Sequence, residues 1–291
     1  MRFDSYHPAI NLIYFAAVIA MTIAFTQPVF LLIGYVCAFV YSVKLKGLHA
    51  LIFDLALIPI IALWAMFYAY YNHFGVTELF LNVIGNTITL ESLVYGIVIG
   101  IRAAGAAMWM SCVHEVMTTD KTAYLLGRVC PKLSLYFCMI LRMIPRVKGQ
   151  YQNMKLARSC IGCGGRNVFS RMGEFFKKLS AVLTWLFDAL GQTADSMKSR
   201  GYTLKGRTAF SIYRFDNRDR SFVISLFFCI IAVLMGAMLS QTSALYSPEI
   251  VINRITPLSY AFYVAHAVMC LMPMGLQIAG EVSFERRVVK V

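Results

Sequence analysis

Charged residues are scarce in this sequence, and acidic residues are the scarcest. Of its 291 residues 14% are charged, whereas typical soluble domains carry about 25%. Apolar residues make up 59% of the chain, and the mean hydropathy is +0.67. This composition excludes an ordinary soluble domain, a disordered chain and a secreted disulfide-rich scaffold. It is typical of a multi-pass membrane protein.

Motifs for nucleotide or metal chemistry are also missing. No Gly-x-x-x-x-Gly-Lys-Ser/Thr motif occurs, so the chain encodes no phosphate-cradling loop for ATP hydrolysis. Its one Cys-x-x-Cys pair, Cys160 and Cys163, has no second pair or nearby His to complete a tetrahedral zinc site. We expect no cofactor and no metal ion, with metal or redox use of this pair as the minor alternative. The other cysteines are expected to be reduced and to fill helix interfaces.

Apolar runs long enough to cross a membrane are abundant. A crossing helix needs about 20 apolar residues, because every backbone amide in the hydrocarbon must be bonded within its own segment. Six such helices are predicted, at about 9–26, 28–43, 52–72, 93–113, 222–242 and 256–279. Thr26, Gln27 and Pro28 predict the reversal between the first two, because proline restricts the residue before it and lacks an amide proton. The predicted fold class is an all-α polytopic membrane protein.

Basic residues in the loops predict the orientation. With the N-terminus inside, the cytoplasmic segments hold 25 of the 27 Lys and Arg residues, and the outer loops hold only Arg254. We therefore expect a protein of the cell membrane with both termini in the cytoplasm. The remaining basic residue, Arg102, interrupts the fourth helix. A charge at that depth costs at least about 2.5 kcal/mol, so Arg102 should face the bundle and pair with a carbonyl, a partner subunit or Asp54.

One cytoplasmic segment carries nearly all of the net charge. Residues 114–220 hold 19 basic and 7 acidic residues, a net charge of +12 out of +13 for the chain. Three regions are therefore predicted: a four-helix membrane region at 1–113, a basic cytoplasmic module at 114–220, and a membrane hairpin with a basic tail at 221–291. Such a module could face anionic lipid, an acidic protein surface or nucleic acid, and proximity to lipid is the simplest explanation.

Two amphipathic helices are predicted within the basic module, from Lys132 to Arg158 and from Gly173 to Arg200. Pro145 interrupts the first helix and should kink it. The second would be about 40 Å long at 1.5 Å per residue. Its polar face carries Lys177, Lys178, Asp188, Asp195 and Lys198. A helix with such a face is not expected to span the membrane, so both should lie along or beneath the inner leaflet, or against each other.

The two amphipathic helices end in similar ways. The first closes with Ala157, Arg158 and Ser159, and the second with Ser199, Arg200 and Gly201. A local explanation suffices for either arginine alone, because a cation in the last turn favours the negative end of the helix dipole and glycine suits a left-handed helix end. The repetition on successive helices suggests a second role. Two forked guanidinium groups could each dock into an acidic groove of a paired partner.

Several stretches resemble the transmembrane T component of energy-coupling factor (ECF) transporters, the CbiQ-like family, whose complexes import vitamins and metal ions. The resemblance covers nearly the whole chain and is most specific from about Gly96 to Tyr202. It rests on SYHPAINLIYF, GIRAAGAAMWM, TTDKTAYLLGRVCPK, LRMIPRV, KLARSCIG and ADSMKSRGY.

The resemblance implies specific partners. In that family the T component joins a membrane-embedded, substrate-capturing S component to two cytoplasmic ABC-type ATPases, and an Ala-Arg-Gly motif at each coupling-helix tip seats in one ATPase. By this resemblance Arg158 and Arg200 make the contact, and nucleic acid is not a partner. The residues that would shape the two tips are Ala157, Ser159, Ser199 and Gly201. The lipid bilayer is the remaining partner.

This sequence departs from that motif once at each tip. Ser159 stands where the first motif has glycine, and Ser199 stands where the second has alanine. Serine adopts a left-handed conformation less readily than glycine, which calls the tight backbone of the first tip into question. Docking is also expected to require that the two tips lie close to one another, outside the hydrocarbon and free of the chain's own carboxylates.

Three hypotheses of different classes follow. The first is a non-catalytic coupling subunit of an ATP-driven vitamin or metal importer. The second is a membrane scaffold or anchor, whose basic helices recruit anionic lipid or a signalling partner. The third is a membrane enzyme that uses His114, Glu115 and Asp120, although no serine or second histidine at helical spacing completes a catalytic set.

Overall fold

Helix dominates this chain, as its long apolar runs predict. The computed structural model describes residues 3–81, 87–161, 168–202, 204, 213 and 215–288. It is 82% helical. The chain divides into two compact units, one formed by Met1–Thr118 with Tyr213–Val291 and the other by Thr119–Ile212. We call them the membrane unit and the cytoplasmic unit, after the locations that the sequence predicts for them.

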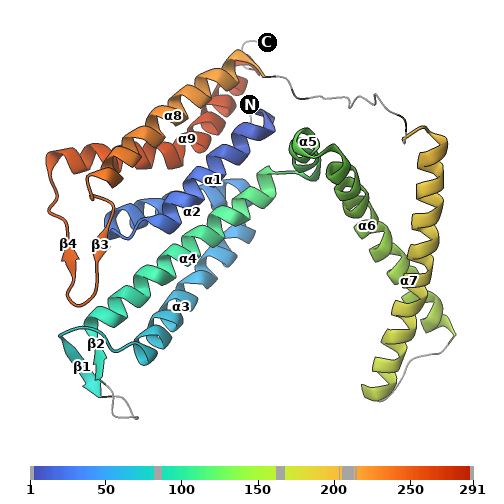
Figure 1. Cartoon of the computed structure of the whole chain (residues 1–291), viewed down its shortest axis with the longest axis horizontal. Helices are drawn as coiled ribbons and strands as arrows, with labels where there is room; N and C mark the ends of the chain where they lie inside the picture. Colours follow the sequence, from blue (N-terminus) through green and yellow to red (C-terminus); the bar gives the residue numbers. More distant parts are fainter. Residues whose placement is uncertain are drawn as a thin grey trace. The chain divides into compact units, whose positions relative to one another are not determined.

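Each of the six predicted membrane segments coincides with one helix of the membrane unit (Figure 1). These helices are α1 (Pro8–Ala24), α2 (Pro28–Lys46), α3 (Leu48–Tyr71), α4 (Leu90–Val116), α8 (Asn217–Met238) and α9 (Pro257–Val288), preceded by the short 3-10 helix η1 (Phe3–Ser5). Among the described residues, five of the six helices are long and apolar enough to span a membrane. The exception is α1, a shorter apolar helix of 17 residues.

The reversal between α1 and α2 lies where the sequence predicts it. Gln27 is the N-cap of α2 and Pro28 its first residue, a position where proline's missing amide costs nothing. The backbone amides of Thr26 and Gln27 both donate to the carbonyl of Thr242, each at 3.1 Å. These bonds tie the turn to the segment between α8 and β3.

Helices α3 and α4 pack closely through small residues. A Cβ atom on Gly96 would lie 3.0 Å from both Cα and the carbonyl oxygen of Ala65, and one on Gly100 would lie 2.9 Å from Cγ2 of Ile61. Gly96 and Gly100 are four residues apart and so share a face of α4. This arrangement lets two membrane helices approach backbone to backbone, which favours association in lipid.

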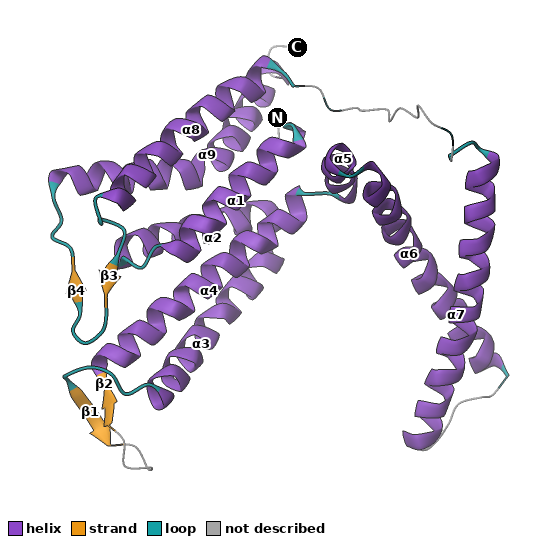
Figure 2. Ribbon diagram, viewed as in Figure 1, coloured by secondary structure: helices purple, strands orange, loops and turns teal. Residues whose placement is uncertain are grey.

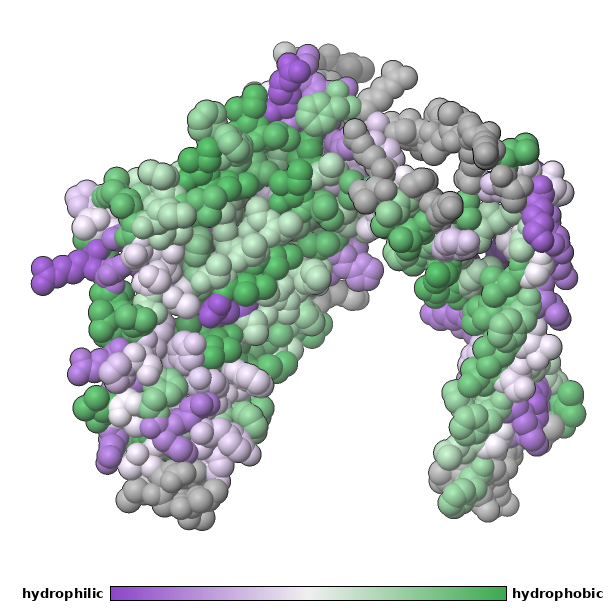
Figure 3. Space-filling view, viewed as in Figure 1, coloured by the Kyte–Doolittle hydropathy of each residue, from purple (hydrophilic) through white to green (hydrophobic). Residues whose placement is uncertain are grey.

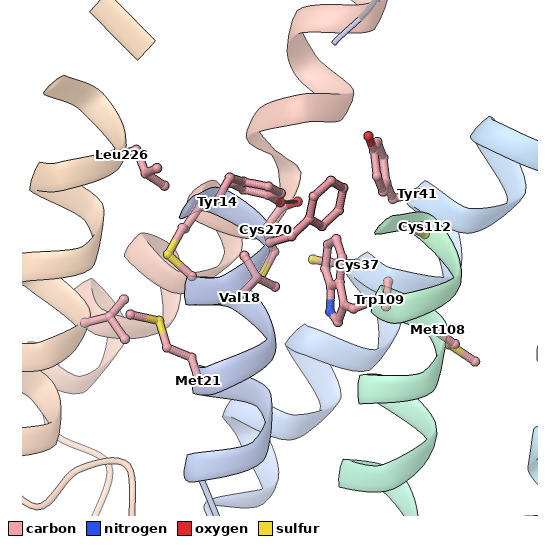
Figure 4. Close-up of a cluster of buried hydrophobic side chains, with 14 of the residues drawn as sticks. Tyr14, Val18, Met21, Cys37, Tyr41, Met108, Trp109, Cys112, Leu226 and Cys270 are labelled. Atoms are coloured by element: carbon pink, nitrogen blue, oxygen red, sulfur yellow. Dashed lines mark hydrogen bonds between the residues drawn. The ribbon is translucent and has the colours of Figure 1, made fainter. Parts of the chain in front are cut away.

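An aromatic cluster fills the core of the membrane unit. Trp109 on α4 is fully buried, and its ring centroid lies 5.9 Å from that of Tyr41 on α2 and 6.4 Å from those of Tyr14 and Phe15 on α1. Figure 4 shows Trp109, Tyr14 and Tyr41 converging there. The Tyr14 hydroxyl donates to the carbonyl of Cys270 on α9 at 3.0 Å. The cluster therefore holds four helices around one centre.

Two short ribbons, which the sequence did not predict, interrupt the helical order (Figure 2). Strand β1 (Glu78–Leu81) pairs antiparallel with β2 (Thr87–Thr89), and β3 (Ala244–Leu245) pairs with β4 (Val251–Ile252). In register, Leu81 faces Thr87 and Ala244 faces Ile252. Both ribbons lie at the end of the membrane unit opposite to η1 (Figure 1).

The cytoplasmic unit consists of three helices in its described residues: α5 (Thr119–Val129), α6 (Pro131–Cys160) and α7 (Val168–Ser199). Two of them are the predicted amphipathic helices, and α6 continues through Pro145. The Ser134 hydroxyl of α6 donates to the carbonyl of Ala123 on α5 at 2.7 Å. The sequence segment 162–167, with its glycine cluster and Cys163, lies outside the described residues.

Much apolar surface remains uncovered on both units, as Figure 3 shows for one face. In the membrane unit the uncovered side chains are concentrated on α3 and α8, where the best membrane-crossing windows are only 17% and 22% buried. The most exposed are Leu48, Ile52, Leu63, Met66, Phe228 and Met238. Helices that are apolar and uncovered in this way are suited to lipid or to a membrane partner.

Candidate functional site

A left-handed turn closes the C-terminal end of α7, the second predicted tip. Gly201 has a φ of +76°, and its amide donates to the carbonyl of Lys198 at 3.0 Å. The amide of Tyr202 donates to the carbonyl of Met197 at 3.2 Å. This pair of bonds is the Schellman motif, which satisfies the last carbonyls of a helix and commonly requires glycine at the left-handed position. The motif places Arg200 at the end of the helix.

The two serines that depart from the family motif make the same local bond. The Ser159 hydroxyl donates to the carbonyl of Leu156 at 2.7 Å, and the Ser199 hydroxyl donates to that of Ser196 at 2.9 Å. Each serine therefore satisfies a carbonyl in the last turn of its own helix. At the first tip Ile161 caps α6 with a φ of −85°, and the next position, which corresponds to Gly201 by its place after the helix end, lies outside the described residues.

Arg200 is exposed and forms no ion pair with any residue in the described parts of the chain. The nearby Lys198 and Asp195 form an exposed pair of their own, at 3.6 Å. The guanidinium of Arg200 therefore retains its forked donors for another molecule. This agrees with the requirement for docking at the second tip.

Arg158 differs, because a carboxylate of the same chain already holds it. Its Nη2 atom lies 3.1 Å from Oε1 and 3.0 Å from Oε2 of Glu174, which stands on α7. The Arg158 side chain is 23% exposed, and that of Glu174 is 14% exposed. The expectation that both arginines project freely was therefore wrong for the first tip. Sequence spacing did not show the pair, because it forms only when α7 folds back beside the end of α6.

The two arginine tips lie far apart within the cytoplasmic unit. Glu174, which contacts Arg158, and Arg200 are 26 positions apart, or roughly 39 Å along α7 at about 1.5 Å per residue. One small acidic pocket cannot bind both tips at this separation. The expectation that the two tips lie close to one another was therefore wrong, and docking of both arginines requires two separate binding sites.

An apolar stripe runs along α7 between the tips. Its residues recur at steps of three and four, and they are uncovered within the described part of the unit. They are Phe176, Leu179, Leu183, Phe187 and Leu190, between 37% and 70% exposed. Their exposure indicates a surface that lipid or an apolar partner covers.

The environment of Arg102 differs from the suggested pairing with Asp54. Arg102 on α4 is half-buried and forms no ion pair with a described residue. Asp54 on α3 is fully buried, and neither of its oxygens has a hydrogen-bond partner among them. Lys46, a basic residue near Asp54, donates to the Ser111 hydroxyl and not to Asp54. Arg102 is therefore not paired with Asp54 in this structure.

No catalytic or metal centre is assembled from the residues that the structure describes. His114, Glu115 and Asp120 are all exposed. No group of three or more His, Cys, Asp or Glu residues is placed to hold a metal ion within the described ranges. Cys160 is an exposed free thiol at the end of α6, and its sequence partner Cys163 lies outside those ranges.

Comparison with known proteins identifies the family. The sequence profile of the CbiQ family, a cobalt transport protein, matches residues 5–210, which is more than two thirds of the chain and includes both arginine tips. None of the curated proteins matches the sequence. Members of this family are transport components, generally non-catalytic, of multi-component complexes. The chain is an integral membrane protein that belongs to the CbiQ cobalt transport family, the T-component family of ECF transporters.

Proposed function

We propose that this chain is the transmembrane coupling (T) subunit of an ECF-type ABC importer. In this role it transmits the ATP-driven motion of two cytoplasmic ATPases to a membrane-embedded S component that captures a vitamin or a metal ion. The observation that carries the proposal is the pair of arginines at the ends of α6 and α7, roughly 39 Å apart along α7. That separation suits two ATPase subunits, one at each tip.

The proposal includes six membrane crossings with both termini in the cytoplasm. Helix α1 is 17 residues long, or about 26 Å, which is close to the thickness of the hydrocarbon core. It packs in the same core as α4 and α9, through Tyr14. Six crossings return the chain to its starting side. An odd number of crossings would place the two termini on opposite sides of the membrane. The contact between η1, near the N-terminus, and the C-terminal helix α9 favours an even number.

The proposed mechanism is mechanical. When ATP closes the ATPase pair, the two docking grooves move relative to each other and carry Arg158 and Arg200 with them. The α6 and α7 helices pass this displacement to the S component, which contacts the uncovered apolar stripe of α7. The chain itself performs no chemistry, and the S component determines which molecule is transported. The family description makes cobalt the first substrate to examine.

The proposal is tested by charge reversal at both tips. Arg158→Glu with Arg200→Glu should abolish co-purification with the two ATPases while the chain still inserts in the membrane. The matched control is Lys155→Glu with Lys198→Glu, which makes the same change in charge on the same helices at two other exposed residues. The control should retain at least half of the wild-type complex, because the guanidinium forks remain.

Two outcomes would contradict the proposal. Unchanged complex yield in the double arginine variant would show that the tips do not hold the ATPases. Equal loss in the variant and in its control would show that net charge alone matters. The second outcome, together with binding that weakens with salt and is unaffected by nucleotide, is what the scaffold hypothesis expects.

A further inference from the structure

Glu174 contacts only one of the three nitrogen atoms of the Arg158 guanidinium. Both contacts run through a single nitrogen, Nη2, which lies between the two carboxylate oxygens. The Nε atom of Arg158 is buried and has no hydrogen-bond partner within the described chain. The strongest arginine–carboxylate geometry instead uses two nitrogens in parallel. Glu174 is therefore a carboxylate that a better-aligned acceptor could replace.

Glu174 also has a second basic neighbour. The Lys177 ammonium lies 3.9 Å from its Oε1 atom, one turn further along α7. If Arg158 leaves, Lys177 remains beside the carboxylate and reduces the cost of exposing it. The pair is mostly buried, so an unpaired charge there would be costly, whereas exchange keeps Arg158 paired with a carboxylate and leaves Lys177 beside Glu174.

We propose that Glu174 holds Arg158 in reserve, so that the two tips engage acidic partner sites in order: Arg200 first, and Arg158 second by exchange from Glu174. This inference rests on the proposed function. Arg200 is exposed and has no ion-pair partner among the described residues, so it interacts with an approaching acidic groove at once. Arg158 binds only after the groove at the first tip supplies a carboxylate that displaces Glu174.

Ordered engagement predicts different kinetic effects at the two tips. A charge that is exposed before binding mainly controls the association rate, and one that is paired late mainly controls dissociation. In the full chain, reconstituted in lipid nanodiscs and binding its two ATPases, Arg200→Ala should lower the association rate severalfold. Arg158→Ala should leave that rate within about twofold and raise the dissociation rate instead. Equal effects of the two variants on association would overturn the proposed order.

The competing role of Glu174 has a direct test. Glu174→Gln keeps the size of the side chain and removes its charge, so it should tighten ATPase binding by up to about fivefold. Asp188→Asn makes the same charge change on an exposed part of α7, more than ten residues from Glu174 and from Arg200, and should leave binding unchanged. In an Arg158→Ala background, Glu174→Gln should have no effect, because the carboxylate acts through the arginine.

Three other results would contradict the inference, and they differ in what they imply for the proposed function. If Glu174→Gln binds like the wild type or more weakly, while Arg158→Ala still raises dissociation, Glu174 does not compete and the proposed function stands. If Glu174→Gln has the same effect with and without Arg158, its role is structural and the inference is overturned. If neither arginine affects binding, both the inference and the proposed function are contradicted.

Discussion

The amide of Tyr202 donates to the carbonyl of Met197 at 3.2 Å, across the left-handed residue Gly201. This bond shapes the second tip, because it ends α7 sharply and places Arg200 at the turn. At the first tip, Glu174 on α7 holds Arg158 from the side, and the residues that follow Ile161 lie outside the described ranges. Arg158 and Arg200 stand in similar sequence motifs, but Arg158 is paired with a carboxylate and Arg200 forms no ion pair with a described residue.

Gly201→Ala should loosen the second tip. Alanine in the left-handed conformation costs about 1–2 kcal/mol. Its Cβ would also lie 3.1 Å from Cδ1 of Leu204. Hydrogen exchange should therefore speed up at the amides of residues 201 and 202, while the middle of α7 stays protected.

The matched control for that change is Gly191→Ala, within α7. A Cβ at Gly191 meets nothing within 4 Å, and glycine inside a helix is about 0.5–1 kcal/mol less favourable than alanine. This variant should stabilise α7 slightly. If both variants exchange at the wild-type rate at residues 201 and 202, the left-handed turn is not what orders the tip.

The sequence predicted those features that depend on local chemistry. Pro28 marks the start of α2, and Gly201 marks the end of α7, because each acts on its own backbone. Apolar runs located the six long helices of the membrane unit, five of which, among the described residues, are long and apolar enough to span a membrane. The T-component resemblance, confirmed by the family match, directed attention to the two arginines.

Features that depend on packing between distant segments were missed. The Arg158–Glu174 pair requires α7 to lie beside α6, and no periodic pattern signals it. The environment of Arg102 depends on how α3 and α4 pack, and Asp54, its suggested partner, does not form a pair with it. The ribbons were missed because strands of two to four residues carry almost no alternating pattern.

Gly96→Ala should weaken the contact between α3 and α4. The added Cβ would lie 3.0 Å from the backbone of Ala65, so one helix has to move, and overpacking typically costs about 1–3 kcal/mol. The melting temperature of the purified protein in detergent should fall. Gly275→Ala on α9, where a Cβ meets nothing within 4 Å, should leave it unchanged or raise it slightly. If the melting temperature fell equally in both variants, the effect of Gly96→Ala could not be assigned to close packing of α4 against α3.

Replacing His114 and Glu115 together by alanine should leave transport unchanged. Both side chains are exposed, and neither belongs to a metal-binding group within the described residues. Uptake of radioactive cobalt by cells that express the complete complex measures the effect. A loss of uptake at normal protein levels would favour the membrane-enzyme hypothesis instead.

Ionic strength should affect assembly in a tip-dependent manner. Contacts of an exposed arginine are screened by salt, with a Debye length of about 10 Å at 0.1 M. Raising the salt concentration should therefore slow ATPase association in the wild type. The association rate of Arg200→Ala should depend less steeply on salt concentration. Pull-down and rate measurements across a salt series would show this. An identical slope in Arg200→Ala would mean that this arginine does not guide association.

The most direct test of the central claim is site-specific photocrosslinking from the tips. A photoreactive residue placed at Ser159 or Ser199, both exposed, should crosslink to the ATPase chains in the assembled complex. The same residue at Ser180, exposed in the middle region of α7, should not. We predict ATPase adducts from both tip positions and none from Ser180. Adducts from neither tip, in complexes that still contain the ATPases, would contradict the account.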